Sequence, residues 1–121
     1  MKICLQNLIR NTKMQINKVY WTEDAAFDLE EIIDYIFQDR ESIAIKIYDE
    51  IKQVTASLKV NAKRNRIVPE LQNIGITNYR EIIYKGYRII YKLEMKNIYI
   101  IAVIDSRRDF ETLIFKRLLR K

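Results

Sequence analysis

Arginine side chains are the groups in this sequence whose type and position best suit chemistry on an anionic target. Arg80 and Arg88 stand in two neighbouring stretches rich in Tyr and Ile, and Arg107 and Arg108 follow a third apolar stretch. A guanidinium group can hold a phosphate through two parallel hydrogen bonds. If Arg88 faces a groove, it can serve as such a phosphate clamp. Otherwise it is an ordinary strand charge, which Glu81 on the preceding stretch could neutralise.

Histidine is absent from the 121 residues, and Cys4 is the one cysteine. The side chain that titrates near neutral pH without perturbation is therefore missing, which excludes Ser-His-Asp and Cys-His catalysis and a Cys/His zinc site. Proton transfer would need a carboxylate, a Tyr or a Lys with a shifted pKa, and we expect no metal or other cofactor. A single cysteine forms no internal disulfide, which favours a cytoplasmic protein. The longest apolar stretch, Ile98–Ile104, is far shorter than the ~20 residues of a membrane-spanning helix.

The net charge of +6 is distributed unevenly along the chain. Residues 20–58 contain ten acidic and three basic side chains, whereas residues 79–121 contain eleven basic and five acidic ones. This asymmetry favours contact between the second half and a polyanion or an acidic partner. The alternative is that Lys and Arg keep the edges of strands soluble and have no partner.

Hydrophobic periodicity in the first half predicts a strand followed by two helices. Residues 16–20 alternate between apolar and polar side chains, which is typical of a short strand. Thr22 is a favourable N-cap for a helix over residues 22–38, and Asp39 or Ser42 could cap the next one. The second helix carries an apolar stripe from Ala44 to Leu58. The short connection predicts an antiparallel hairpin packed on a sheet, with a coiled-coil dimer as the alternative.

The second half predicts a sheet and a final helix. Three stretches rich in β-branched and aromatic residues predict strands: Tyr79–Tyr84, Tyr87–Leu93 and Ile98–Ile104. Lys85 and Gly86 form a two-residue hairpin loop between the first two, and a short helical stripe runs over residues 110–118. The segment around Pro69 reads as a connector. We therefore predict an α+β fold in which an antiparallel sheet packs against an N-terminal α-hairpin, in the order β-α-α-β-β-β-α.

This order and several short motifs resemble the RelE/ParE superfamily of toxins. The motifs are Arg66-Ile67-Val68-Pro69-Glu70, Tyr79-Arg80-Glu81-Ile82, Gly86-Tyr87-Arg88-Ile89-Ile90-Tyr91 and Arg107-Arg108-Asp109. The resemblance covers residues 16–115 and implies a single toxin domain over residues 16–121. It also implies that the protein is the toxin of a type II toxin–antitoxin module of the plasmid-stabilisation kind. A cognate antitoxin protein would hold this toxin inactive in a hetero-oligomer.

The superfamily divides by mechanism, and one branch consists of ribosome-dependent mRNA endonucleases that need no metal. For that branch the resemblance implies a catalytic set made up of Arg88 on the phosphate, Arg80, Arg107 and Glu70 as a candidate base. It also implies a set of nucleic-acid-binding residues, which are Arg80, Lys85, Arg88, Arg107 and Arg108. Where endonuclease members carry a catalytic Tyr or His, this chain has Leu113, Ile114 and Phe115.

ParE-like toxins form the other branch, and they bind and poison DNA gyrase without cutting RNA. The Arg-x-Val-Pro-Glu connector, the two matched helical stripes and the missing base favour this branch. The alternative from another functional class is a decayed, non-toxic family member that binds nucleic acid or another protein. Residues 1–15 precede the family pattern. We expect them to form a disordered basic arm; if translation instead starts at Met14, the first 13 residues are not translated.

Overall fold

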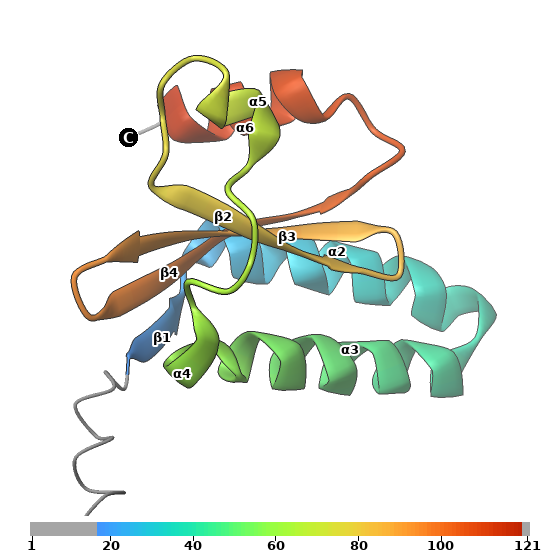
Figure 1. Cartoon of the computed structure of the whole chain (residues 1–121). Coiled ribbons are helices and arrows are strands. Elements are labelled where there is room, and N and C mark those ends of the chain that lie inside the picture. Colours follow the sequence, from blue (N-terminus) through green and yellow to red (C-terminus); the bar gives the residue numbers. More distant parts are fainter. Residues whose placement is uncertain (1–16, 120–121) are drawn as a thin grey trace, which may run out of the picture.

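The computed structural model describes residues 17–119, and in this range a four-stranded sheet lies between two layers of helices (Figure 1). The elements are β1 (Lys18–Trp21), α2 (Glu23–Asp39), α3 (Glu41–Ala56), α4 (Leu58–Asn61), α5 (Pro69–Gln72), β2 (Tyr79–Tyr84), β3 (Tyr87–Glu94), β4 (Asn97–Asp105) and α6 (Phe110–Leu119). The predicted order of the main elements is confirmed. Residue 16 and the predicted N-terminal extension lie outside the described residues.

The sheet has the strand order β1-β4-β3-β2 and is mixed. Strands β2, β3 and β4 form the predicted antiparallel meander. Strand β1 instead pairs in parallel with β4, with Lys18 opposite Asn97 and Trp21 opposite Ile100, so the prediction of an antiparallel sheet is wrong for this strand. A four-residue alternation shows which side chains are buried, but it contains no information on the partner strand or its direction.

Helices α2 and α3 form the predicted hairpin, although only α2 has a side-chain cap. The hydroxyl of Thr22 accepts a hydrogen bond from the Ala25 N–H at 3.2 Å and donates one to the Ile100 carbonyl at 2.8 Å. The cap therefore also ties the start of α2 to β4. The cap of α3 is Arg40, which makes no side-chain hydrogen bond to the helix. The prediction of Asp39 or Ser42 as its cap is wrong.

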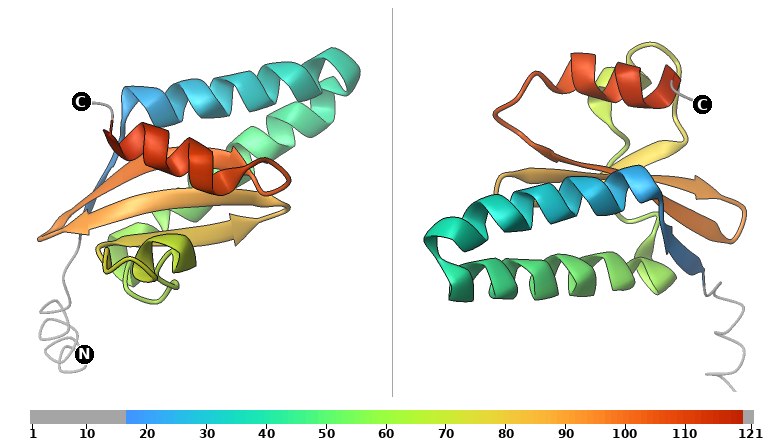
Figure 2. Two further views of the ribbon diagram at one scale, coloured as in Figure 1. Left: turned by 90° about the horizontal axis from the view of Figure 1, so that it is seen from above. Right: turned by 180° about the vertical axis from the view of Figure 1, so that it is seen from behind.

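Each face of the sheet has its own apolar core, and the two layers of helices are seen from above and from behind in Figure 2. The α2–α3 hairpin covers one face, and the buried residues there include Leu29, Ile51, Leu58, Ile89, Tyr91 and Ile100. Helices α5 and α6 cover the other, with Val68, Leu71, Ile90, Ala102, Phe110 and Ile114. Ile89 and Ile90 are neighbours in β3 and point into different cores, because successive side chains alternate across a strand.

The segment before α5 lies along the free edge of β2. The Val68 N–H donates to the Tyr79 carbonyl and the Glu81 N–H donates to the Arg66 carbonyl, each over 3.0 Å. The predicted connector therefore covers half of this edge strand and then continues as a short helix. Pro69 is the first residue of α5, a position where its missing N–H costs no helical hydrogen bond. None of the helices that the structure describes has the length and apolarity to cross a membrane.

Candidate functional site

Arg88 is the centre of a charge network on the face of the sheet that α5 and α6 cover. Its Nε donates to Glu81 Oε1 at 2.7 Å, and its two terminal nitrogens donate to the two carboxylate oxygens of Glu70 at 2.8 and 3.1 Å. The guanidinium carbon lies 3.6 Å from the centroid of the Phe110 ring. The guanidinium group is thus held by β2, by α5 and by the first residue of α6.

Glu81 anchors the network inside the protein. Its side chain has no exposed surface, and its second oxygen accepts a hydrogen bond from Arg66 Nε at 2.6 Å. A buried carboxylate is costly unless it is paired and hydrogen-bonded, and two arginines satisfy this carboxylate here. We call Arg66, Glu81, Arg88 and Glu70 the Arg88 network.

The contacts of the Arg88 network favour the charged forms of Glu70 and Arg88. The hydrogen bond from Arg88 holds the pKa of Glu70 below its usual value. Burial alone would lower the pKa of Arg88, but hydrogen bonds to Glu70 and Glu81 outweigh burial and raise this pKa above its usual value. A carboxylate with a lowered pKa is a weaker base, so this position of Glu70 suits ion pairing better than proton abstraction.

Arg80 lies on the opposite face of the sheet from Arg88. Tyr84 pairs with Tyr87 across the hairpin, so Arg80 is opposite Tyr91, whose side chain belongs to the core beneath α2 and α3. The Nη1 atom of Arg80 donates to the Asn65 carbonyl at 2.6 Å. The two arginines, which the resemblance places in one catalytic set, therefore do not line one concave surface.

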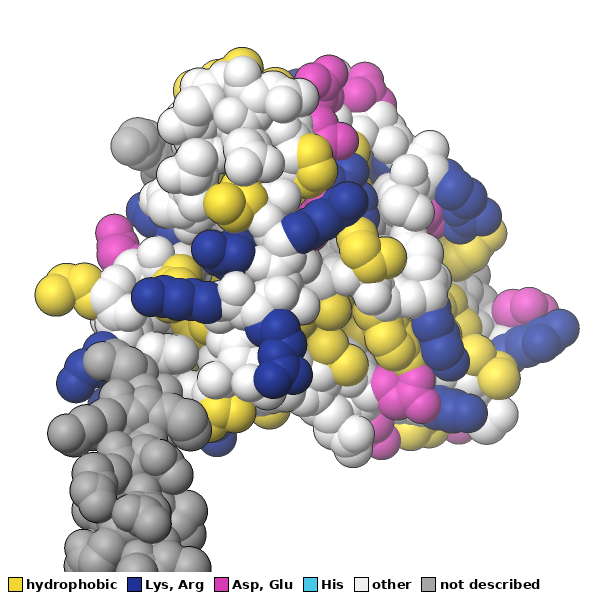
Figure 3. Space-filling model, in the orientation of Figure 1, with side chains coloured by type: hydrophobic (Ala, Val, Ile, Leu, Met, Phe, Trp, Pro, Cys, Tyr) yellow, Lys and Arg dark blue, Asp and Glu magenta, His cyan; other side chains and the backbone are white. Residues whose placement is uncertain are grey.

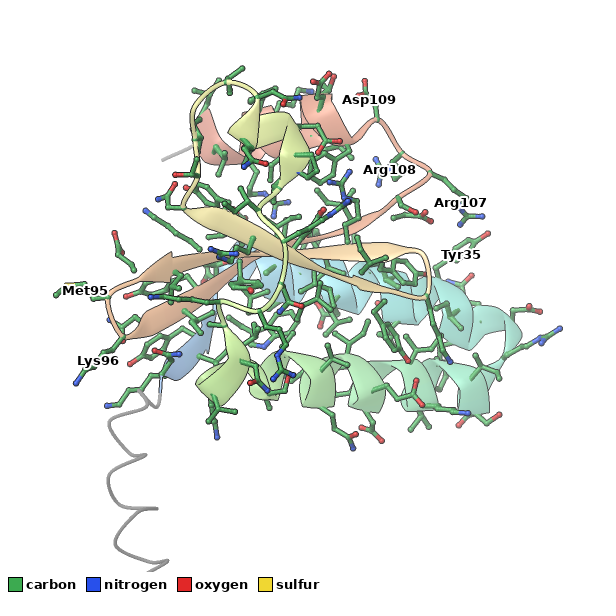
Figure 4. The ribbon with its side chains drawn as sticks, in the orientation of Figure 1. Tyr35, Met95, Lys96, Arg107, Arg108 and Asp109 are labelled. Atoms are coloured by element: carbon green, nitrogen blue, oxygen red, sulfur yellow. The ribbon has the colours of Figure 1, made fainter. Side chains whose placement is uncertain are left out.

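Arg107 and Arg108 occupy the loop between β4 and α6, where Figure 4 shows them with Asp109 and, below them, Tyr35 of α2. Arg107 is bound to Asp105 through Nε at 3.0 Å and through a terminal nitrogen at 2.6 Å. Hydrogen bonds from the side chain and backbone of Arg107 lower the pKa of Asp105 to about 2. Arg107 is thus an exposed, ion-paired residue of the β4–α6 loop, whereas Arg80 lies in β2.

Lys85 forms an ion pair with a residue of helix α3. Its Nζ lies 3.5 Å from Glu50 Oε1 of α3 and 5.6 Å from the centroid of the Tyr84 ring. The candidate site residues thus fall into three places: the Arg88 network with Glu70, the loop with Arg107 and Arg108, and the face with Arg80 and Lys85. Basic side chains nevertheless spread over the front of the sheet and its left end in Figure 3.

A groove of about 300 Å³ runs along the far half of β4. We call it the β4 groove, and its lining includes Tyr35, Ile36, Tyr87, Arg107, Arg108 and Leu113. Strand β1 pairs only as far as Ile100, so side chains satisfy the backbone of β4 beyond that point. The Val103 N–H donates to Asp28 Oδ2 at 3.0 Å, and the Ile101 carbonyl accepts from Arg117 at 2.8 Å.

The pair of Asp28 and Arg117 was not among the predicted site residues. Arg117 donates to both carboxylate oxygens of Asp28, at 2.9 and 3.0 Å, and so links α6 to α2 past the edge of β4. One signal for Asp28 exists in the sequence, because it stands next to Leu29 on the flank of the buried stripe of its helix. No group of three or more His, Cys, Asp and Glu side chains within residues 17–119 is placed to hold a metal ion.

Comparison with known proteins identifies the family. The family model described as "ParE toxin of type II toxin-antitoxin system, parDE" matches residues 19–110. No curated protein matches the sequence. Among solved structures, a chain of the chromosomal ParDE TA system from P. aeruginosa has the same fold, with a TM-score of 0.62 and 19% sequence identity. The match covers 74% of this chain and 96% of that one. The chain therefore belongs to the family of ParE toxins of type II toxin–antitoxin systems.

Proposed function

We propose that this toxin arrests bacterial growth by poisoning DNA gyrase in the cytoplasm and that a cognate antitoxin relieves the arrest. Membership of the ParE family makes the chain a type II toxin component. The ParE-like branch of the superfamily acts on gyrase. The observation that carries the choice of target is the engagement of Arg88 by Glu70 and Glu81.

An mRNA endonuclease without a metal needs a base for the 2′-hydroxyl and free cations around the reacting phosphate. The side chain of Arg88 is only 11% exposed, and both of its carboxylate partners are in place. A phosphate would have to displace Glu70 from the guanidinium group before Arg88 could hold it. These contacts support a structural role for Arg88 and so favour the activity that requires no RNA cleavage.

The antitoxin is expected to be acidic. Residues 79–121 carry eleven basic and five acidic side chains, and a surface with such an excess of positive charge attracts a partner of opposite charge. The structural relative belongs to a ParDE TA system, and we propose the same kind of partner here. A small acidic reading frame beside the gene is the first candidate.

Two assays on the purified full chain separate the two mechanisms. We expect the protein to inhibit supercoiling by DNA gyrase and to leave a reporter mRNA intact on translating ribosomes. Addition of the antitoxin should restore supercoiling. Ribosome-dependent cleavage of the mRNA with unaffected gyrase would overturn the proposal.

Expression in bacteria tests the toxin activity itself. Induction of the chain alone should arrest growth, and co-expression of the neighbouring acidic reading frame should relieve the arrest. Normal growth at confirmed soluble expression, with gyrase and mRNA both unaffected in vitro, would instead identify a decayed member of the family.

A further inference from the structure

A row of aromatic and basic side chains crosses all four described strands near the β3–β4 turn. The strand register places Tyr20 opposite Tyr99, Tyr99 opposite Lys92, and Lys92 opposite Tyr79. Directly paired residues on neighbouring strands point to the same face of a sheet, so these side chains share one surface. Tyr79 packs against the core under α5 and α6, which identifies the face. We call these residues the tyrosine row.

Two rings of the tyrosine row are stacked at the edge of the sheet. The centroids of the Tyr20 and Tyr99 rings are 5.5 Å apart, and their planes differ by 20°. Strand β1 is an edge strand of the sheet, and Tyr20 is 45% exposed. The stack therefore ends at an accessible ring, on which a further planar group can lie.

Lysines accompany this stack. Lys92 Nζ lies 5.9 Å from the centroid of the Tyr79 ring and 3.5 Å from Glu94 Oε2. Lys18 is exposed and stands two positions before Tyr20, on the same face of β1. Lys96 is beside Met95 at the tip of the β3–β4 turn, as Figure 4 shows. The basic side chains around the row outnumber the acidic Glu94.

We propose that the tyrosine row binds single-stranded nucleic acid. In this arrangement a base extends the Tyr20–Tyr99 stack, while Lys18 and Lys92 contact the phosphates on either side. Sheets with aromatic side chains on adjacent strands bind unpaired bases in this way, and stacking tolerates every base because each has a π-face. The base must be unpaired, since a duplex keeps its bases stacked on one another. This surface includes none of the residues of the Arg88 network.

An acidic peptide is the rival occupant of such a basic surface. The lysines alone would attract it, and it would make no use of a stacked pair of rings that ends at the exposed Tyr20. The tyrosine stack is therefore the feature that favours a nucleic acid, and the test must separate stacking from charge.

Fluorescence anisotropy of a labelled ten-nucleotide oligo-dT or oligo-U with the full chain tests the proposal. We expect saturable binding that weakens as salt increases. Tyr20→Ala should weaken binding by about fivefold to a hundredfold, whereas Tyr20→Phe should bind as the unchanged protein does because the ring is kept. Lys92→Gln should weaken binding of all sequences alike and reduce the salt dependence by about one charge.

Matched controls lie away from the tyrosine row. Tyr35 of α2 is 79% exposed, and Tyr35→Ala should leave binding unchanged, as should Lys46→Gln on α3. Equal losses in Tyr35→Ala and Tyr20→Ala would overturn the proposal, and so would preference for a duplex of the same length. Displacement by an oligo-glutamate peptide at equal concentration would assign the surface to charge alone. The measurement involves neither gyrase nor ribosomes, so its outcome is independent of the proposed function.

Discussion

At the scale of one residue, the ion pair with Glu70 determines whether Arg88 is available to a phosphate. Glu70 binds the end of a guanidinium group that is already held by Glu81 and stacked on Phe110. An isolated arginine at the same place would be available to a phosphate. The carboxylate occupies both terminal nitrogens and fastens α5 to the sheet.

This contact gives the stability of the protein a defined dependence on pH. Unfolded Glu70 takes up its proton near pH 4.5, and the hydrogen bond from Arg88 lowers the pKa in the folded protein. The stabilisation is therefore complete above the unfolded pKa and is lost as pH falls through the lowered one. We expect the thermal midpoint of the unchanged protein to exceed that of Glu70→Gln at pH 6–7 and the two to converge in acid. A difference that stays constant down to pH 3 would contradict this assignment.

At the scale of elements, β4 depends on side chains where it has no neighbouring strand. Helix α2 contributes Asp28 to the Val103 N–H, and α6 contributes Arg117 to the Ile101 carbonyl. Backbone groups at a sheet edge must be satisfied or exposed to water. The pair thus protects the edge and joins the two helical layers.

Replacing Arg117 by Met tests this bridge. The methionine keeps the apolar part of the side chain but removes the donors to Ile101 and Asp28. We expect a loss of about 1.5–3 kcal/mol in the free energy of unfolding, as for hydrogen bonds to a charged group, and faster hydrogen exchange at the Val103 amide. Arg108→Met, on the neighbouring loop, is the control and should change neither. Unaltered exchange at Val103 in Arg117→Met would show that Asp28 holds the edge without help.

Much of the secondary structure can be predicted from the sequence, but little of the candidate site can. The two helices and the antiparallel meander follow from local periodicity, and the two-residue loop at Lys85–Gly86 fixes the pairing of Tyr84 with Tyr87. That register already implies opposite faces for Arg80 and Arg88, so their separation is readable from the sequence. The partner of Arg88 on α5 is not, because Glu70 is 18 positions away and is brought there by packing.

At the scale of the whole molecule, one sheet connects two cores that share no helix among the described elements. Ile89 lies under the α2–α3 hairpin, and its neighbour Ile90 lies under α5 and α6. A change in one core can therefore reach the other through the shared strands β3 and β4 or through the Asp28–Arg117 pair. We expect the domain to unfold in a single transition, as small domains usually do.

Ile114→Ala tests whether the two cores unfold together, because a fluorescent residue in the opposite core can report on the effect. Ile114 of α6 is fully buried, and truncation of such a side chain costs about 2–5 kcal/mol. Trp21, the one tryptophan of the chain, packs against the core under α2 and α3. If the sheet unites the two cores, the urea midpoints from Trp21 fluorescence and from far-ultraviolet circular dichroism should fall together. Leu119→Ala changes the same helix at an 80% exposed position and should leave both midpoints in place. A fluorescence midpoint that stays fixed while the circular dichroism midpoint falls would mean that the α5–α6 layer unfolds by itself.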